Sequence, residues 1–128
     1  MLPNFLLPEN VCREDGVGPI LDLGAAQGNF ISLTLGITRI IEQESLEVGI
    51  WGSPDGIEWG ARPLQSLPQK FYCGTYAFLL DLSRYPENRY LRAQWKMNRW
   101  GRGEQQPMFE FYVFADVVET PVLAARGA

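Results

Sequence analysis

Alternation between apolar and polar residues is the strongest pattern in the chain. Between residues 30 and 41, Leu33 and Leu35 belong to an apolar face, whereas Ser32 and Thr34 belong to a polar one. A two-residue period of this kind is typical of a β-strand that buries one face. The pattern predicts strands over residues 20–23, 30–41, 46–51, 71–82, 89–100 and 108–119.

These strands predict an all-β fold, because no segment shows the period of an amphipathic helix. Short strands separated by turns every ~8–12 residues are typical of an antiparallel β-sandwich. The long connection over residues 60–69 and the segment before the first strand favour a jelly-roll-like strand order over a meander. The expected inner core includes Leu33, Leu35, Val48, Ile50, Leu91, Trp95, Phe111 and Val113.

A chain of 128 residues is expected to form one domain. Its first nineteen residues hold no clear period and are interrupted by Pro and Gly, yet Phe5, Leu6 and Leu7 are apolar. An apolar arm can add main-chain hydrogen bonds to the sheet edge of a neighbour, so these three residues are candidate assembly residues. The expected organisation is an extended N-terminal arm over residues 1–19, a sandwich over residues 20–119 and a tail over residues 120–128.

A tight turn is predicted where residues 53–59 read Ser-Pro-Asp-Gly-Ile-Glu-Trp. Ser at the first turn position, Pro at the second and Gly at the fourth suit a type I turn. Asp55 can accept hydrogen bonds from nearby backbone amides. We therefore expect Asp55, Gly56 and Trp59 to have a mainly structural role in a strand–turn–strand hairpin.

This seven-residue segment resembles two known patterns. It is similar to the Asp-box hairpin of sialidase-type propellers, but a propeller repeats its motif in every blade and this chain contains the segment once. It also resembles a hairpin of discoidin-like, galactose-binding-like sandwiches and of phage virion sandwiches. That resemblance implies a jelly-roll β-sandwich over residues 30–119 and ligand binding by loops at one end, here residues 53–59 and 100–106.

The chain contains no His, and this excludes several kinds of chemistry. Ser-His-Asp and Cys-His catalysis are excluded, as are zinc sites that use His. No acidic or glycine-rich motif predicts a metal or nucleotide site, so we expect a protein that is not an enzyme and has no cofactor. Cys12 and Cys73 are expected to be buried thiols, and a disulfide between them is the alternative.

Charge is unevenly distributed along the sequence. Residues 70–102 carry seven basic and two acidic side chains, whereas residues 40–61 carry five acidic and no basic ones. Two oppositely charged faces would suit head-to-tail association, and the alternative is charge pairing across neighbouring strands. The net charge of −4 and the pI near 4.8 argue against nucleic-acid binding.

Two functions follow from these features. The first is a non-catalytic structural protein that assembles with itself, through its arm and sandwich faces, into a homo-oligomer, tube or filament. The second is a carbohydrate-binding sandwich, because Trp51, Trp59, Tyr76, Tyr90 and Trp100 could stack on sugar rings beside polar side chains. The candidate ligand or interface residues are Trp59, Trp100, Arg102 and Asp55.

The first eight residues lack the basic start and the long apolar run of a secretory signal. No stretch approaches the ~20 apolar residues of a membrane-spanning helix. We therefore expect synthesis in the cytoplasm without a signal peptide, no membrane insertion, and a place in an intracellular or released assembly.

Overall fold

The computed structural model describes residues 2–40, 44–99 and 108–118. Nearly all of its regular structure is β-strand, with two short 3-10 helices at the turns. The elements are β1 (Asn4–Cys12), β2 (Gly16–Val17), β3 (Leu21–Asp22), η1 (Gly24–Ala26), β4 (Phe30–Ile40), β5 (Glu44–Ser53), β6 (Gln65–Ser66), β7 (Gly74–Asp81), η2 (Leu82–Arg84), β8 (Tyr90–Arg99) and β9 (Phe109–Val117).

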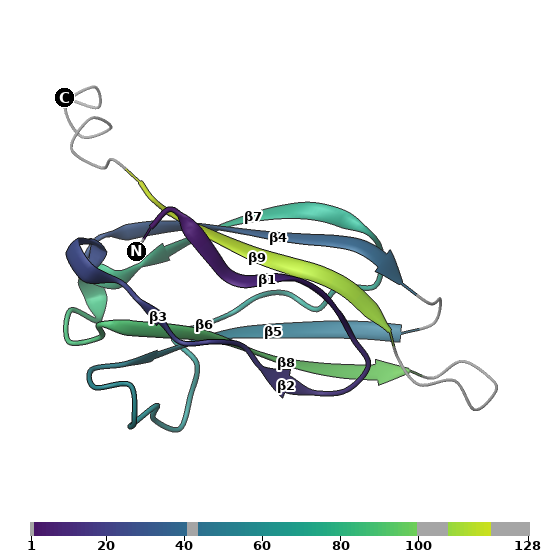
Figure 1. The fold of residues 1–128 in the computed structure, drawn as a ribbon, viewed down its shortest axis with the longest axis horizontal. Helices are drawn as coiled ribbons and strands as arrows, with labels where there is room; N and C mark the ends of the chain where they lie inside the picture. Colours follow the sequence, from purple (N-terminus) through teal and green to yellow (C-terminus); the bar gives the residue numbers. More distant parts are fainter. Residues whose placement is uncertain (1, 41–43, 100–107, 119–128) are drawn as a thin grey trace.

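The strands form two antiparallel sheets that pack face to face (Figure 1). The first sheet has the order β1-β9-β4-β7, and the second has the order β2-β8-β5-β6 with β3 also paired to β8. Strands that follow one another, such as β4 and β5 or β8 and β9, lie in different sheets. This alternation between two four-strand paths is the connectivity of a jelly roll, so the structure confirms the predicted sandwich.

The core lies between the two sheets and is built from the inward faces of the long strands. In β4, residues 31, 33, 35 and 37 are buried, as their two-residue period predicts. The eight residues predicted for the inner core are all buried. Trp95 and Phe111 connect the two sheets with an edge-to-face contact, their ring centroids 5.6 Å apart.

The N-terminal segment corrects a prediction. Instead of leaving the sandwich as an arm, β1 pairs with β9, with Asn4 opposite Ala115 and Cys12 opposite Phe109. Leu6 and Leu7 are 0% and 6% exposed, so both belong to the core of their own chain. The predicted boundary between an arm at 1–19 and a sandwich at 20–119 is therefore wrong; the predicted tail lies outside the described residues.

The N-terminal segment shows no regular period in the sequence because the register of β1 is irregular. Its pairing with β9 shifts between Phe5 and Leu7 and again between Leu7 and Asn10. Each shift interrupts the two-residue period, which allows the adjacent residues Leu6 and Leu7 both to be buried. Pro8 is tolerated because β1 is an edge strand, where an amide can be missing from the outer side.

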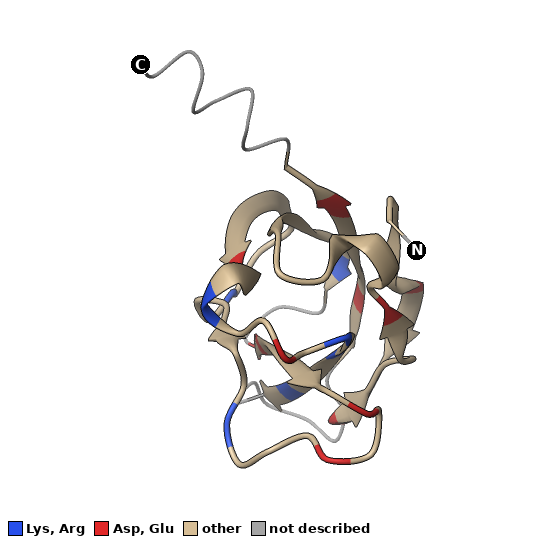
Figure 2. Cartoon of the chain, turned by 90° about the vertical axis from the view of Figure 1, so that its left-hand side faces the viewer, with Lys and Arg blue, Asp and Glu red and all other residues tan. Residues whose placement is uncertain are grey.

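The charge pattern is resolved by the pairing of β5 with β8. Their register places Glu47 of the acidic segment opposite Lys96 of the basic segment, so the two segments are neighbours in one sheet. Figure 2 shows both signs of charge in the view turned by 90°. The alternative of cross-strand placement is favoured over two opposed charged faces.

Cys12 and Cys73 are both free thiols, and Cys73 is exposed, contrary to its predicted burial.

Candidate functional site

The Ser-Pro-Asp-Gly turn is held by its own side chains. Ser53 Oγ accepts hydrogen bonds from the amides of Asp55 (3.3 Å) and Gly56 (2.8 Å), and Gly56 adopts a positive φ of 80°. Asp55 Oδ1 in turn accepts from the amides of Ile57 and Glu58, each at 2.9 Å. The carboxylate of Asp55 is thus engaged within the turn, which supports the structural role predicted for it. The predicted strand directly after the turn is wrong: residues 54–64 form no strand, and the chain returns to β5 only at β6.

These hydrogen bonds predict a pH dependence. The amides of Glu58 and Ile57 hold the pKa of Asp55 below its ordinary value. A group with a lowered pKa in the folded state stabilises the protein above its unfolded pKa of about 3.9 and loses this effect as the pH falls through the folded value. We expect Asp55→Asn to be less stable than the wild type at pH 7.

The measurement is urea unfolding of both proteins across the acidic range. The stability difference should narrow as the pH falls below about 4, because the unfolded chain then binds a proton and the folded carboxyl becomes protonated as the pH falls further through its lowered pKa. Asn keeps an acceptor oxygen at the same position, so this variant isolates the charge. A difference that stays constant with pH would contradict the assignment.

Trp59 lies beside Arg92, a basic residue on the outer face of β8. The guanidinium carbon of Arg92 is 4.2 Å from the centroid of a Trp59 ring, which is a cation–π contact. Arg92 Nε is buried and has no hydrogen-bond partner among the described residues. Arg92 is also the cross-strand neighbour of Trp51 in β5. The other two predicted ligand residues, Trp100 and Arg102, lie outside the described residues.

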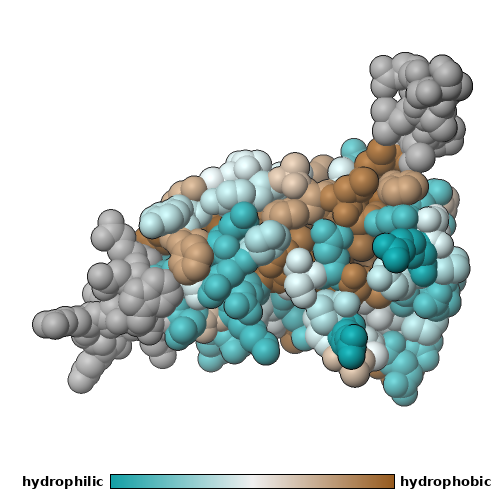
Figure 3. Space-filling model, turned by 180° about the vertical axis from the view of Figure 1, so that it is seen from behind, coloured by the Kyte–Doolittle hydropathy of each residue, from teal (hydrophilic) through white to brown (hydrophobic). Residues whose placement is uncertain are grey.

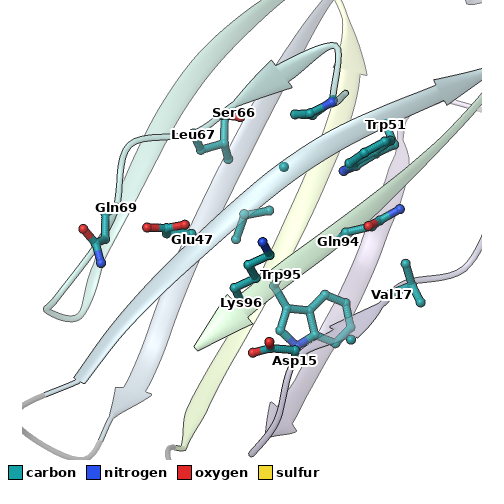
Figure 4. A pocket seen from close by; sticks show the side chains of 14 residues that line it. Asp15, Val17, Glu47, Trp51, Ser66, Leu67, Gln69, Gln94, Trp95 and Lys96 are labelled. Carbon is teal, nitrogen blue, oxygen red and sulfur yellow. The ribbon is translucent and has the colours of Figure 1, made fainter. Parts of the chain in front are cut away.

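A groove of about 740 Å³ opens on the outer face of the second sheet. Its floor is formed by β5 and β8. One wall contains Asp15 and Val17, and the opposite wall contains Pro63, Ser66 and Gln69. We call this site the sheet groove; Figure 4 shows its lining side chains. The volume is in the range of small-molecule sites, which is about 300–1,000 Å³.

Three cross-strand pairs bring the floor residues together. Gly49 lies opposite Gln94 and Glu47 lies opposite Lys96, both in the groove. The third pair, Trp51 with Arg92, places the cation–π contact next to the end of the groove that Trp51 lines. Side chains opposite one another in an antiparallel pair lie on the same face of the sheet, so a single outer face carries an indole, an amide and three charges.

Gly49 determines the shape of the floor around Trp51. A Cβ atom at this position would lie 3.3 Å from Trp51 Nε1 and 3.4 Å from Pro63 Cβ. The missing side chain therefore leaves room for the indole to lie close to the strand. Trp51 is half-buried, and its Nε1 donates to no acceptor within the described part of the chain. A partly exposed ring and an available donor are thus presented together.

The charged groups of the sheet groove are also largely available. The ion pairs between described residues join Arg39 to Glu110 and Arg89 to Asp22, outside the groove. Glu47 and Lys96 take part in neither pair, whereas Asp15 Oδ1 accepts a hydrogen bond from the amide of Met97 at 2.7 Å. A carboxylate, an ammonium group and amide side chains can therefore reach a ligand lying across the floor.

The sequence contained partial signals for this site. Trp51 is one of the aromatic residues that the sequence offers for sugar stacking, whereas Trp59 and Trp100 are the ones in the loops that the family resemblance implies. A glycine inside a strand, as at Gly49, signals a close approach. Glu47, Gln94 and Lys96 could not be connected to it without knowing which strand pairs with β5.

The described residues provide no cluster of three or more His, Cys, Asp or Glu side chains suited to a metal ion. In that same part of the chain, no helix is long and apolar enough to span a bilayer. A scan against protein-family models finds no match, and a search of curated proteins finds no similar sequence. The function must therefore be inferred from the site itself.

Proposed function

We propose that this protein is a non-catalytic carbohydrate-binding domain, and that the sheet groove is its ligand site. The observation that carries this proposal is the half-buried indole of Trp51, which lies beside Gly49 and among uncommitted polar side chains. A flat aromatic surface can pack against the apolar face of a sugar ring. Polar groups around it can then form hydrogen bonds with the ring hydroxyls.

The composition of the floor favours a saccharide over a purely apolar ligand. Glu47 can accept hydrogen bonds, Lys96 can donate them, and the amide of Gln94 can do both. Hydroxyl groups are donors and acceptors at once, so they can satisfy all three. An apolar ligand would instead desolvate the two charges without pairing them, which is costly.

The groove runs across the sheet between two walls and is not an enclosed cavity (Figure 4). An open groove of this shape can hold an internal segment of an extended chain. We therefore favour an oligosaccharide or polysaccharide over a monosaccharide. Arg92, which lies next to Trp51 and stacks on Trp59, is placed to extend the contact surface beyond one end of the groove.

The test is binding of wild-type and Trp51→Ala proteins to an array of neutral and acidic glycans, followed by calorimetric titration with the best ligand. Trp51→Ala is expected to weaken binding about tenfold or more, which corresponds to about 1.4 kcal/mol. The cause is loss of the stacking surface.

Phe5→Ala is the matched control, because it removes a 43% exposed aromatic ring from the other sheet. This variant should bind as the wild type does. Circular dichroism should show that both variants are folded. Absence of any glycan ligand, or equal losses in the two variants, would contradict the proposal.

The predicted self-assembly through an N-terminal arm loses its main support, because Leu6 and Leu7 are buried in their own chain. Self-association has separate support from a different element, the edge strand β7.

A further inference from the structure

β7 is the most open edge of the molecule. It is eight residues long, and it pairs with β4 from Gly74 to Asp81 without a register shift. The described strands provide no neighbour on its other side. It contains no Pro and no Lys, and Asp81 at its end is its one charged residue. Long, regular edge strands of this kind are templates for pairing with another chain.

The other edges of the two sheets carry features that hinder pairing with another chain. β1 carries Pro8 and Glu9 and has two register shifts. The edge strands of the second sheet, β2, β3 and β6, have two residues each. Irregular pairing, Pro, charge and short length are the devices that prevent edge-to-edge association. Three edges of the sandwich carry such devices and β7 does not, so the contrast marks β7 as an interaction surface.

The hydrogen-bonding groups of this edge follow from its register. The amide of Leu82 donates to the carbonyl of Asn29, which continues the pairing of β7 with β4. The amide of Val118 donates to the carbonyl of Phe30, which continues the pairing of β9 with β4. Since antiparallel strands alternate between bonded and non-bonded pairs, the even-numbered residues of β7 bond to β4. Thr75, Ala77 and Leu79 therefore direct their N–H and C=O groups away from the sheet, where no described residue bonds to them.

The side chains on this edge are compatible with burial. Leu79 is 54% exposed, although it is large and apolar, and Ala77 and Thr75 beside it are exposed as well. Seen from behind, hydrophobic side chains gather on the surface of the molecule (Figure 3). A second strand added here would cover Leu79 and would satisfy the outward backbone groups in one step.

We propose that β7 pairs antiparallel with β7 of a second copy of this chain, around a two-fold axis near Ala77, so that two four-stranded sheets merge into one. An antiparallel pair of identical strands is self-complementary. About this axis, Thr75 of each copy lies opposite Leu79 of the other, and the two Asp81 side chains lie at opposite ends of the paired strands, so no like charges of β7 face each other.

The dimer is independent of carbohydrate binding, because β7 belongs to the first sheet and the groove to the second. A failure of one proposal therefore leaves the other intact. The geometry also keeps both grooves open, since pairing at the β7 edge does not use the outer face of the second sheet.

The experiment is sedimentation equilibrium of the full chain over a range of concentrations. The wild type is expected to be a dimer. Leu79→Lys should weaken the dimer at least tenfold, because it places a charge on the pairing edge. Ile20→Lys is the matched control: Ile20 is 51% exposed, close to the 54% of Leu79, but lies outside β7. It should leave the dimer unchanged.

Ala77→Pro provides a second test that preserves the fold. The amide of Ala77 points outward, so Pro removes a donor from the free edge without removing one from the β4 ladder. This variant should be a monomer with a melting temperature near that of the wild type. A wild type that is monomeric at every concentration, or a dimer that survives both β7 variants, would overturn the proposal. If the wild type is monomeric, a strand of a different protein becomes the expected partner of the β7 edge.

Discussion

Replacing Leu6 by alanine is expected to lower the free energy of unfolding by about 2–5 kcal/mol. Leu6 is 0% exposed and packs in the core although it lies close to the N-terminus. Truncating it removes buried methyl groups and leaves a cavity, and both effects destabilise the folded state. Because whole domains are stable by only about 5–15 kcal/mol, the variant could lose a large part of its stability. Urea unfolding followed by tryptophan fluorescence measures the change.

Phe5→Ala is the matched control for this prediction. Phe5 precedes Leu6 in β1, but its ring is 43% exposed and packs edge-on against Tyr112 and Phe114 on the outer face. Its truncation should cost clearly less than that of Leu6. If residues 1–19 formed a detached arm, both substitutions would leave the unfolding midpoint unchanged, and this outcome would contradict the pairing of β1 with β9.

Replacing Phe111 by alanine should have a comparable or larger effect, about 3–5 kcal/mol. Phe111 is fully buried near the start of β9 and contacts Trp95 of the opposite sheet with ring centroids 5.6 Å apart. The substitution therefore removes both apolar burial and an aromatic contact between the two layers. Calorimetric melting should show a large fall in Tm.

Phe114→Ala tests the other face of the same strand. Phe114 is half-buried, and it contacts Phe5 on the outside of the first sheet, with ring centroids 5.1 Å apart. We expect its truncation to cost much less than that of Phe111. Equal losses at the two positions would indicate that β9 has no distinct inner face, and the sandwich described above would then be incorrect.

The proposed function moves the ligand site from the loops at the end of the sandwich to the outer face of a sheet. Asp55 is engaged in its turn and Trp59 is stacked on Arg92. Trp51, in contrast, lines a groove with Gln94 and with charged groups outside the ion pairs of the described residues. The difference matters for experiments, because substitutions in the turn would test folding, whereas substitutions in the groove test binding.

The sequence by itself determined the strands β3, β4, β5, β7, β8 and β9, the inward faces of the long ones, and the hydrogen bonding of the turn at Asp55. In β4 and β8 the two-residue period is regular, so the buried residues Leu33, Leu35, Leu91 and Trp95 could be identified. The turn at Asp55 was predictable for a similar reason, since its hydrogen bonds join residues within three positions of one another. Local periodicity and local hydrogen bonding depend on residues that are close in the chain, so both can be recognised from the sequence alone.

Only the tertiary structure decided how the strands combine. β1 shows no regular period because its register shifts twice against β9, a partner about a hundred positions later in the chain. The groove exists because β5 pairs with β8, which places Trp51 next to Arg92 and Glu47 next to Lys96. The open edge of β7 depends on its place at the end of the first sheet. All three features arise from contacts between distant segments, and the period of a single strand carries no information about its partner, its register or its position in the sheet.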